Sequence, residues 1–219
     1  ALRWEAKGAK AFAGGPVVAG GRVYIGNNDG RLYAFDAATG EQLWTFATGI
    51  EVECTPAVWH GLALFGGFDG KVYALDAATG AKRWEFQTGP RRAGFKGVEE
   101  VRQGVDSGIA LAAGRAYFGG WDGKVYCLEG ETGRLVWSFQ TGGMIHWSAL
   151  AVAEGKAVIG STDGVIQGLD ADKGTLAWRA RLAEAHADHM MSGPTIADGM
   201  VYVGGGYENK LYALCLADG

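Results

Sequence analysis

Short alternations of hydrophobic and polar positions recur along the whole chain. In the first copy Val23 and Ile25 alternate with their neighbours, and Leu32 and Ala34 repeat the pattern further on. A period of two predicts β-strands, and convincing helical spacing is absent from the sequence. In this copy the pattern predicts four strands, at residues 16–19, 22–26, 31–35 and 42–47. The fold class is therefore predicted to be all-β.

One sequence segment occurs in five copies along the chain. Residues 21–44 recur at 61–84, at 114–137 and, more loosely, at 155–178, and a fifth copy runs from 199 to 219. Four antiparallel strands in about 40 residues are typical of a β-propeller blade. The chain ends inside its fifth copy, and its first residues supply the missing Trp, so we expect the two ends to pair and close a ring. The prediction is one domain, 1–219, a five-bladed propeller whose fifth blade is completed by residues 1–8.

The turns assign each segment to one side of this propeller. Asp-Gly pairs at 29–30, 69–70, 122–123 and 163–164 lie between predicted strands and indicate type I′ hairpins. With antiparallel strands, these hairpins share one side, here called the top face, with the connections between blades. The turns at Gly21, Gly61, Gly114, Gly155 and Gly199 then lie on the bottom face, where the copies are nearly uniform.

The repeat Val-Tyr-Ile-Gly-x-x-Asp-Gly-x-Leu-Tyr-Ala-Phe-Asp-Ala-Ala-Thr-Gly-x-x-x-Trp resembles the pyrroloquinoline-quinone (PQQ) type propeller repeat. The family includes quinoprotein dehydrogenases, a periplasmic outer-membrane-assembly lipoprotein and bacterial sensor propellers, so the resemblance implies a periplasmic or other extracytoplasmic location. It also implies a tryptophan-docking motif that locks neighbouring blades, formed with Trp4, Trp44, Trp84, Trp137 and Trp178. Cys215 replaces the motif's Asp in the fifth copy, which predicts weaker docking there.

Composition and charge argue against some classes of partner. Glycine supplies 38 of 219 residues, and the net charge is −4 without blocks of like charge, so we expect neither nucleic acid nor an anionic membrane as a partner. No apolar run approaches the ~18 residues that span a bilayer, and the chain shows no signal peptide. Cys54, Cys127 and Cys215 form no disulfide framework or zinc knuckle, and Cys54 is expected to be a buried, unreactive thiol.

The top face differs from blade to blade. Aligning the copies places Glu53, Asp106 and Trp147 at one position beside the channel mouth, with His146 and His189 close by. Carboxylates and imidazoles together suit a divalent transition metal or a small polar ligand, and the candidate metal ligands are Glu53, Asp106, His146 and His189. The alternative is an ordinary solvated rim whose histidines bond to loop carbonyls. Further candidates on this face are Arg91 and Arg92 in the longest connection, His186 and Asp188 in the last one, and Trp121 and Tyr207 in the hairpins.

No nucleophile elbow, phosphate-binding loop, dinucleotide fingerprint or zinc-protease helix is present. We therefore favour a noncatalytic, monomeric propeller that binds a protein, a peptide or a small polar ligand at its top face. The alternative is a metal- or cofactor-dependent enzyme at the channel mouth, including a quinoprotein-like oxidoreductase. PQQ itself is not expected, because five blades leave a narrow channel. The sequence leaves a divalent metal as a possible cofactor.

Overall fold

The computed structural model describes residues 1–90, 104–182, 192–205 and 209–219. Every regular element within these ranges is a β-strand, and the strands form five antiparallel sheets, here called blades 1 to 5. Blade 1 contains β1 (Phe12–Ala19), β2 (Arg22–Asn27), β3 (Arg31–Asp36) and β4 (Gln42–Ala47), and blade 2 contains β5 (Ala57–Trp59), β6 (Leu62–Gly66), β7 (Lys71–Asp76) and β8 (Lys82–Gln87). Blade 3 contains β9 (Ala110–Ala112), β10 (Arg115–Gly119), β11 (Lys124–Glu129) and β12 (Leu135–Gln140). Blade 4 contains β13 (Ala151–Ala153), β14 (Lys156–Gly160), β15 (Val165–Asp170) and β16 (Leu176–Arg181), and blade 5 contains β17 (Thr195–Ala197), β18 (Met200–Gly204) and β19 (Leu211–Cys215).

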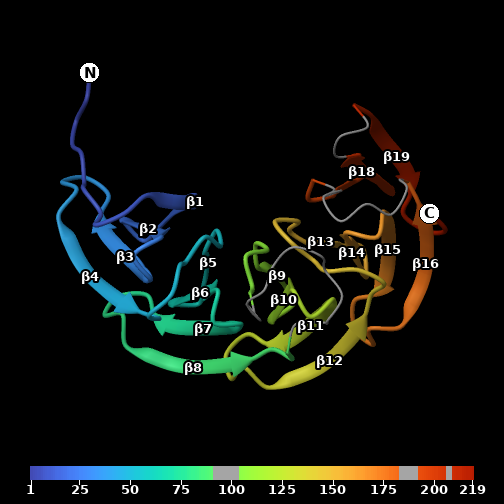
Figure 1. The fold of residues 1–219 in the computed structure, drawn as a ribbon, viewed down its shortest axis with the longest axis horizontal. Helices are drawn as coiled ribbons and strands as arrows, with labels where there is room; N and C mark the ends of the chain where they lie inside the picture. Colours follow the sequence, from blue (N-terminus) through green and yellow to red (C-terminus); the bar gives the residue numbers. More distant parts are fainter. Residues whose placement is uncertain (91–103, 183–191, 206–208) are drawn as a thin grey trace.

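The five blades stand side by side along an arc (Figure 1). Strands pair in chain order within each blade, with β1, β5, β9 and β13 on the inner side of the arc and β4, β8, β12 and β16 on the outer side. The all-β prediction is confirmed, and the four strands predicted for the first copy match β1 to β4, with β1 beginning earlier than expected.

The hydrophobic core lies between consecutive blades. Middle strands such as β7 and β11 are buried at nearly every position because a neighbouring blade covers each of their faces. Outer strands alternate instead, and in β8 only Trp84 is buried. One cluster joins each of the four consecutive pairs of blades, for example Leu32 and Trp44 of blade 1 with Phe65 and Tyr73 of blade 2. The described residues form no such cluster between blades 5 and 1.

The type I′ prediction for the Asp-Gly pairs is wrong. Gly30 has φ +83°, but Asp29 is not in the left-handed region, and Asn27 pairs with Arg31 across a three-residue loop. Only one residue of this loop needs positive φ, as in a type I turn followed by a left-handed glycine. Two-residue turns with two left-handed positions occur on the bottom face instead, at Gly20-Gly21 and at His60-Gly61, for example.

Each repeat tryptophan contacts the next blade along the chain. Its indole N–H donates to a backbone carbonyl of that blade: Trp4 to Ala37 (3.1 Å), Trp44 to Ala77 (3.2 Å), Trp84 to Gly130 (3.1 Å), Trp137 to Ala171 (3.1 Å) and Trp178 to Leu216 (2.8 Å). A left-handed glycine lies flat against each ring, and a Cβ at Gly80 would fall 2.7 Å from Trp44. The bond to blade 5 is as short as the others, so the geometry shows no weakening beside Cys215.

Ring closure is not seen. Blade 5 has three strands among the described residues, and residues 1–8 do not pair with β19. The N-terminal segment lies against blade 1 through Trp4, and blades 1 and 5 stand at opposite ends of the arc (Figure 1). Pairing of residues 1–8 with β19 therefore stays a prediction.

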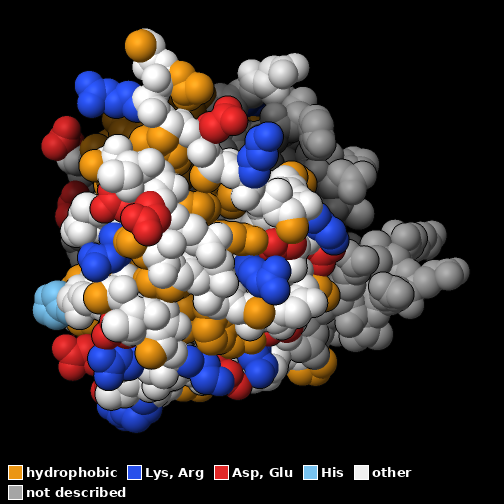
Figure 2. All heavy atoms as spheres, turned by 90° about the vertical axis from the view of Figure 1, so that its left-hand side faces the viewer, with side chains coloured by type: hydrophobic (Ala, Val, Ile, Leu, Met, Phe, Trp, Pro, Cys, Tyr) orange, Lys and Arg blue, Asp and Glu red, His pale blue; other side chains and the backbone are white. Residues whose placement is uncertain are grey.

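The surface carries both signs of charge. Over the side of the arc where blade 1 lies, basic and acidic side chains are interspersed, with apolar side chains between them (Figure 2). This mixture gives no basic stripe of the kind that follows a nucleic-acid backbone. In the parts of the chain that the structure describes, no helix is long and apolar enough to cross a bilayer.

Candidate functional site

Two connections between blades and one hairpin bring four predicted residues together on the top face. Asp106 lies in the connection that precedes β9, and His146 and Trp147 lie in the one that precedes β13. Trp121 comes from the hairpin between β10 and β11. Asp106 and His146 each contact the other three residues, so hairpins and connections share one side of the arc.

Asp106 is the centre of this group. Its carboxylate is completely buried and accepts hydrogen bonds from Trp121 Nε1 (3.0 Å) and from the backbone N–H of Trp147 (3.3 Å). Its second oxygen, Oδ2, is in ion-pair contact with Nδ1 of His146, although the two atoms are not aligned as in a hydrogen bond. Neither atom has a hydrogen-bond partner among the described residues, so each is left with the other as its nearest polar group.

A row of aromatic rings runs across the same place. Phe68 packs on Trp121 with ring centroids 5.0 Å apart, Trp121 on His146 at 5.0 Å, and His146 on Trp147 at 4.5 Å. Phe68 is buried, whereas the Trp147 side of the row opens to solvent, with 58% of Trp147 exposed. The row therefore links the interior of blade 2 to an exposed indole on the top face.

Trp147 also has an unusual backbone. Its φ is +55°, in the left-handed region that a side chain with a Cβ rarely adopts and that costs about 1–2 kcal/mol. The hydrogen bond from its N–H to Asp106 holds this conformation. The hydrophobic pattern of the sequence carries no signal for such a conformation at Trp147.

Glu53 lies in a third connection, between β4 and β5, and borders the same part of the top face. It lines a cavity of about 600 Å³ together with Asp106 and Trp147, so three of the aligned positions lie around one cavity. The other lining residues, which sequence reasoning missed, are mostly small or apolar and come from β1 and from the starts of the inner strands: Gly14, Thr55, Pro56, Gly108, Ile109, Ala110, Ala149 and Leu150. Cavities of this size are typical of small-ligand sites.

The proposed metal ligands are brought together in part. Asp106 and His146 face each other, and Glu53 lines the cavity with Asp106. Within the described ranges, no group of three or more His, Cys, Asp or Glu side chains is placed to hold a metal ion. His189 lies outside the described residues, as do Arg91, Arg92, His186, Asp188 and Tyr207.

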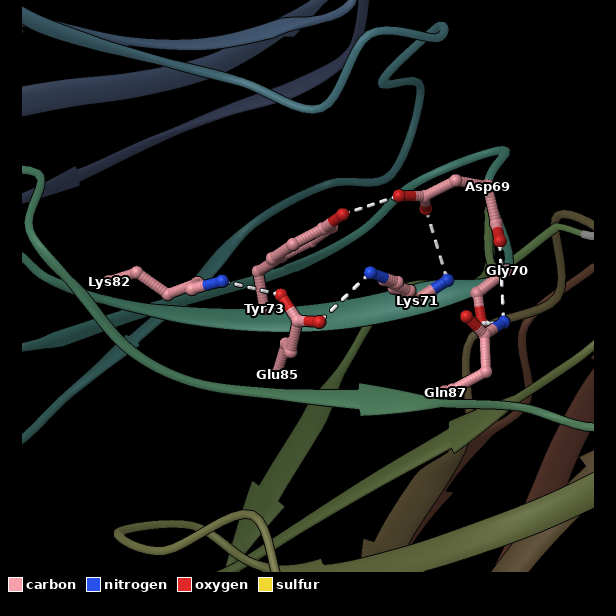
Figure 3. A network of polar contacts seen from close by, with 7 residues as sticks. All are labelled: Asp69, Gly70, Lys71, Tyr73, Lys82, Glu85 and Gln87. Carbon is pink, nitrogen blue, oxygen red and sulfur yellow. Dashed lines mark hydrogen bonds and ion pairs between the residues drawn. The ribbon is translucent and has the colours of Figure 1, made fainter.

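The Asp-Gly hairpins use their carboxylates to hold the turn. In blade 2, Asp69 accepts hydrogen bonds from the Lys71 backbone N–H (3.1 Å) and from the Tyr73 hydroxyl (Figure 3). The Gln87 amide donates to the carbonyls of Asp69 and Gly70, and Glu85 pairs with Lys71. Burial of Tyr73, together with its bond to Asp69, raises the pKa of that phenol. These carboxylates are engaged within the turn.

Cys54 joins two connections below the cavity. It is completely buried, and its Sγ donates to the carbonyl of Ser107 at 3.0 Å. Burial raises the pKa of the Cys54 thiol to about 12. The thiol therefore stays protonated and unreactive at neutral pH, as the sequence predicts.

Repeat, blade and docking geometry define the class of protein: a β-propeller built from PQQ-type repeats, as the sequence predicts. The family model described as outer membrane protein assembly factor BamB matches residues 1–101 and 69–219. The chain belongs to this family.

Solved structures support the same fold. The crystal structure of BamB from Moraxella catarrhalis superposes with a TM-score of 0.80 over 98% of this chain and 67% of that chain, at 20% sequence identity. Quinohemoprotein alcohol dehydrogenase from Comamonas testosteroni superposes with a TM-score of 0.67 over 94% of this chain and 43% of that one, at 18% identity. At these identities the similarity shows the fold alone.

Curated relatives match shorter segments. The quinohemoprotein alcohol dehydrogenase of Comamonas testosteroni is 34% identical over 126 residues, which are 58% of this chain and 12% of that protein. The outer membrane protein assembly factor BamB of Alkalilimnicola ehrlichii is 46% identical over 48 residues, 22% of this chain and 12% of that protein. The matched segments thus span about an eighth of each relative.

Proposed function

We propose that this propeller is a protein-binding scaffold of the outer-membrane-assembly type, located in the periplasm, and that it binds its partner at the top face. The observation that carries the proposal is Trp147, an exposed indole held in a left-handed backbone conformation by a buried carboxylate. Exposed, pre-organised tryptophans are frequent anchors of protein interfaces. The family match supports the scaffold role, because its description is that of an assembly factor.

Photo-crosslinking tests this proposal. A benzophenone amino acid replaces Trp147 on the top face or, as a matched control, His60 in a bottom turn, where the side chain is also exposed. We expect irradiation of cells to crosslink the first variant to a defined envelope protein and the second to none. Equal crosslinking from both positions, or none from Trp147, would contradict the assignment. Size-exclusion chromatography with light scattering checks the accompanying expectation of a monomer.

A quinoprotein oxidoreductase is the second candidate, favoured by the identity to quinohemoprotein alcohol dehydrogenase. The cavity residues do not fit an anionic quinone, because Glu53 and Asp106 are acidic and no Lys or Arg lines the described cavity. Arg91 and Arg92 lie outside the described residues. Alcohol-dependent dye reduction after addition of PQQ and Ca²⁺ would establish this alternative, and we expect none.

The metal hypothesis requires ligands beyond the Asp106–His146 pair, with His189 the first candidate. If a metal binds, the free energy of unfolding rises by roughly 2.7 kcal/mol at a hundredfold excess of metal over its dissociation constant. Zn²⁺ and Mn²⁺ titrations of the wild-type protein and of His189→Ala measure this. A stabilisation that the substitution leaves intact would exclude His189 as a ligand.

We also propose that residues 1–8 can complete blade 5. By the register of blade 1, where Tyr33 faces Thr45, Tyr212 would face Glu5. In the double variant Glu5→Cys with Tyr212→Cys, closure predicts a disulfide within one chain under mild oxidation. Glu5→Cys with Thr195→Cys, on the far strand of blade 5, is the control. A monomer without the crosslink would contradict closure.

A further inference from the structure

The cavity beside Trp147 has an unbalanced charge. Glu53 lines it and is partly exposed, and among the described residues no cation lies within 4 Å of its carboxylate and no group hydrogen-bonds to it. Asp106 adds a second carboxylate, which lies against the imidazole of His146. No Lys or Arg belongs to the described lining. A cavity with an uncompensated carboxylate attracts cations and repels anions.

The cavity also offers apolar and aromatic surface. Trp147 lines one side, and Ile109, Ala110 and Leu150 supply aliphatic surface. The face of an indole attracts a guanidinium or ammonium group, by about 0.5–1 kcal/mol at exposed sites. Lys and Arg side chains bury their aliphatic stems against apolar surface and keep the charged end near a carboxylate. The lining therefore provides a complementary surface for each part of such a side chain.

The conformation of Trp147 at the cavity wall lowers the stability of the fold. The left-handed backbone of Trp147 is held by a hydrogen bond to Asp106, whose buried carboxylate in turn contacts His146. Strained residues of this kind cluster at ligand-binding sites, where the surrounding structure over-determines them. The position of Trp147 at the cavity wall is thus fixed before any ligand arrives, which lowers the entropic cost of binding.

We propose that this cavity binds one basic side chain, Arg or Lys, of an extended segment of the protein partner, with its charge between the Glu53 carboxylate and the Trp147 indole. The inference rests on the proposed function and specifies the chemistry that its top face recognises. It differs from a metal site, because Trp147 is part of the recognition surface. It also differs from a quinone site, because the preferred charge is positive.

Host–guest peptides test the inference on the full chain. Five acetylated, amidated hexapeptides share an Ala/Ser/Gly background and carry Arg, Lys, citrulline, Leu or Glu at one position. Binding is followed by NMR through the indole N–H signals of uniformly ¹⁵N-labelled protein, with the Trp147 signal assigned from Trp147→Asn. We expect the Arg and Lys peptides to shift this signal with millimolar dissociation constants, and the citrulline, Leu and Glu peptides to bind at least fivefold more weakly.

Glu53→Gln should weaken binding of the Arg peptide at least fivefold while leaving the affinity for the Leu peptide unchanged. Glu51→Gln is the matched control, since it removes the same charge two residues away and outside the cavity lining. Trp147→Asn, followed through the neighbouring Trp121 indole N–H signal, should weaken the binding of both basic peptides. Equal binding of Arg and citrulline peptides, equal effects of the two Glu variants, or no binding at 20 mM would overturn the inference. Crosslinking from position 147 without any preference for basic peptides would leave the scaffold proposal standing and reject only the basic side chain.

Discussion

The carboxylate of Asp106 lies against the imidazole of His146, with the Asp106 side chain completely buried and 23% of the His146 side chain exposed. The two residues belong to successive connections, 40 positions apart in the sequence, so their contact ties blade 3 to the start of blade 4. The same carboxylate receives the Trp121 indole and the Trp147 backbone N–H. One buried charge thus organises the exposed part of the top face.

Asp106→Ala should lower the free energy of unfolding by roughly 2–4 kcal/mol, because it leaves His146 and two partly buried donors without their acceptor. Glu53→Ala, in the same cavity but without a described partner, should change it by less than about 0.5 kcal/mol. Urea denaturation followed by circular dichroism measures both. Equal effects from the two variants would mean that the Asp106 contacts contribute no stability.

Trp147 should be replaceable without loss of stability, provided that the new residue tolerates the left-handed backbone. Asn adopts positive φ more readily than most residues, whereas Ala does not. We expect Trp147→Asn to be more stable than Trp147→Ala by about 1 kcal/mol. Parallel urea denaturation of the two variants checks the difference, and a more stable Ala variant would argue against the observed conformation.

The repeat in the sequence predicts most of the fold but only part of the candidate site. Alternating residues and the recurring Trp place every strand of blades 1 to 4, because local pattern and blade packing agree there. Ring closure was expected because the fifth copy lacks its Trp and the first residues supply one, but this pattern does not determine the angle between neighbouring blades. That angle depends on the side chains in each interface, such as Phe65 and Tyr73 between blades 1 and 2.

At the site, alignment of the copies found Glu53, Asp106 and Trp147 because equivalent positions surround the axis. It could not show that His146 pairs with Asp106, nor that Trp147 has positive φ. Both properties depend on the path of an irregular connection, where neither a strand period nor a turn signal applies. The Asp-Gly turn type was missed for a related reason, since Gly alone does not distinguish two left-handed residues from one.

Glycines that face the indoles should be far more sensitive than glycines in open turns. Gly80 and Gly61 have φ of +74° and +76°, but a Cβ at Gly80 would meet Trp44 at 2.7 Å, and one at Gly61 would meet nothing within 4 Å. Gly61→Ala should cost about 1 kcal/mol for the backbone, and Gly80→Ala about 3 kcal/mol once displacement of the ring is added. Equal losses in thermal unfolding would show that the indole contact is unimportant.

The three thiols should react very differently. Burial raises the pKa of Cys54 to about 12 and that of Cys127 to about 11, so at pH 8 both are almost entirely protonated, whereas Cys215 is exposed. The thiolate is the nucleophile, so iodoacetamide should modify only Cys215 in the folded protein and all three in guanidinium. Peptide mapping by mass spectrometry measures this. Alkylation of native Cys54 as fast as Cys215 would contradict its burial.

The turn beside Gly80 also predicts how stability depends on pH. The ion pair with Arg83, together with hydrogen bonds from Thr79, lowers the pKa of Asp76 to about 2. In the unfolded chain an Asp has a pKa of about 3.9. Since the folded pKa is the lower one, the contribution of Asp76 is fully present above the unfolded pKa and is lost as the pH falls toward 2.

Asp76→Asn should therefore lower the melting temperature by a constant amount above about pH 5 and by almost nothing near pH 2, where the wild-type carboxyl is also being protonated. Arg83→Gln removes the main cause of the lowered pKa, so in that background the effect of Asp76→Asn should be smaller and should vary less with pH. Thermal unfolding of the four proteins between pH 2 and 7 measures both differences. An effect of Asp76→Asn that stays undiminished at pH 2, or that is unchanged by Arg83→Gln, would mean that Asp76 stabilises the turn through its hydrogen bonds alone and not through its charge.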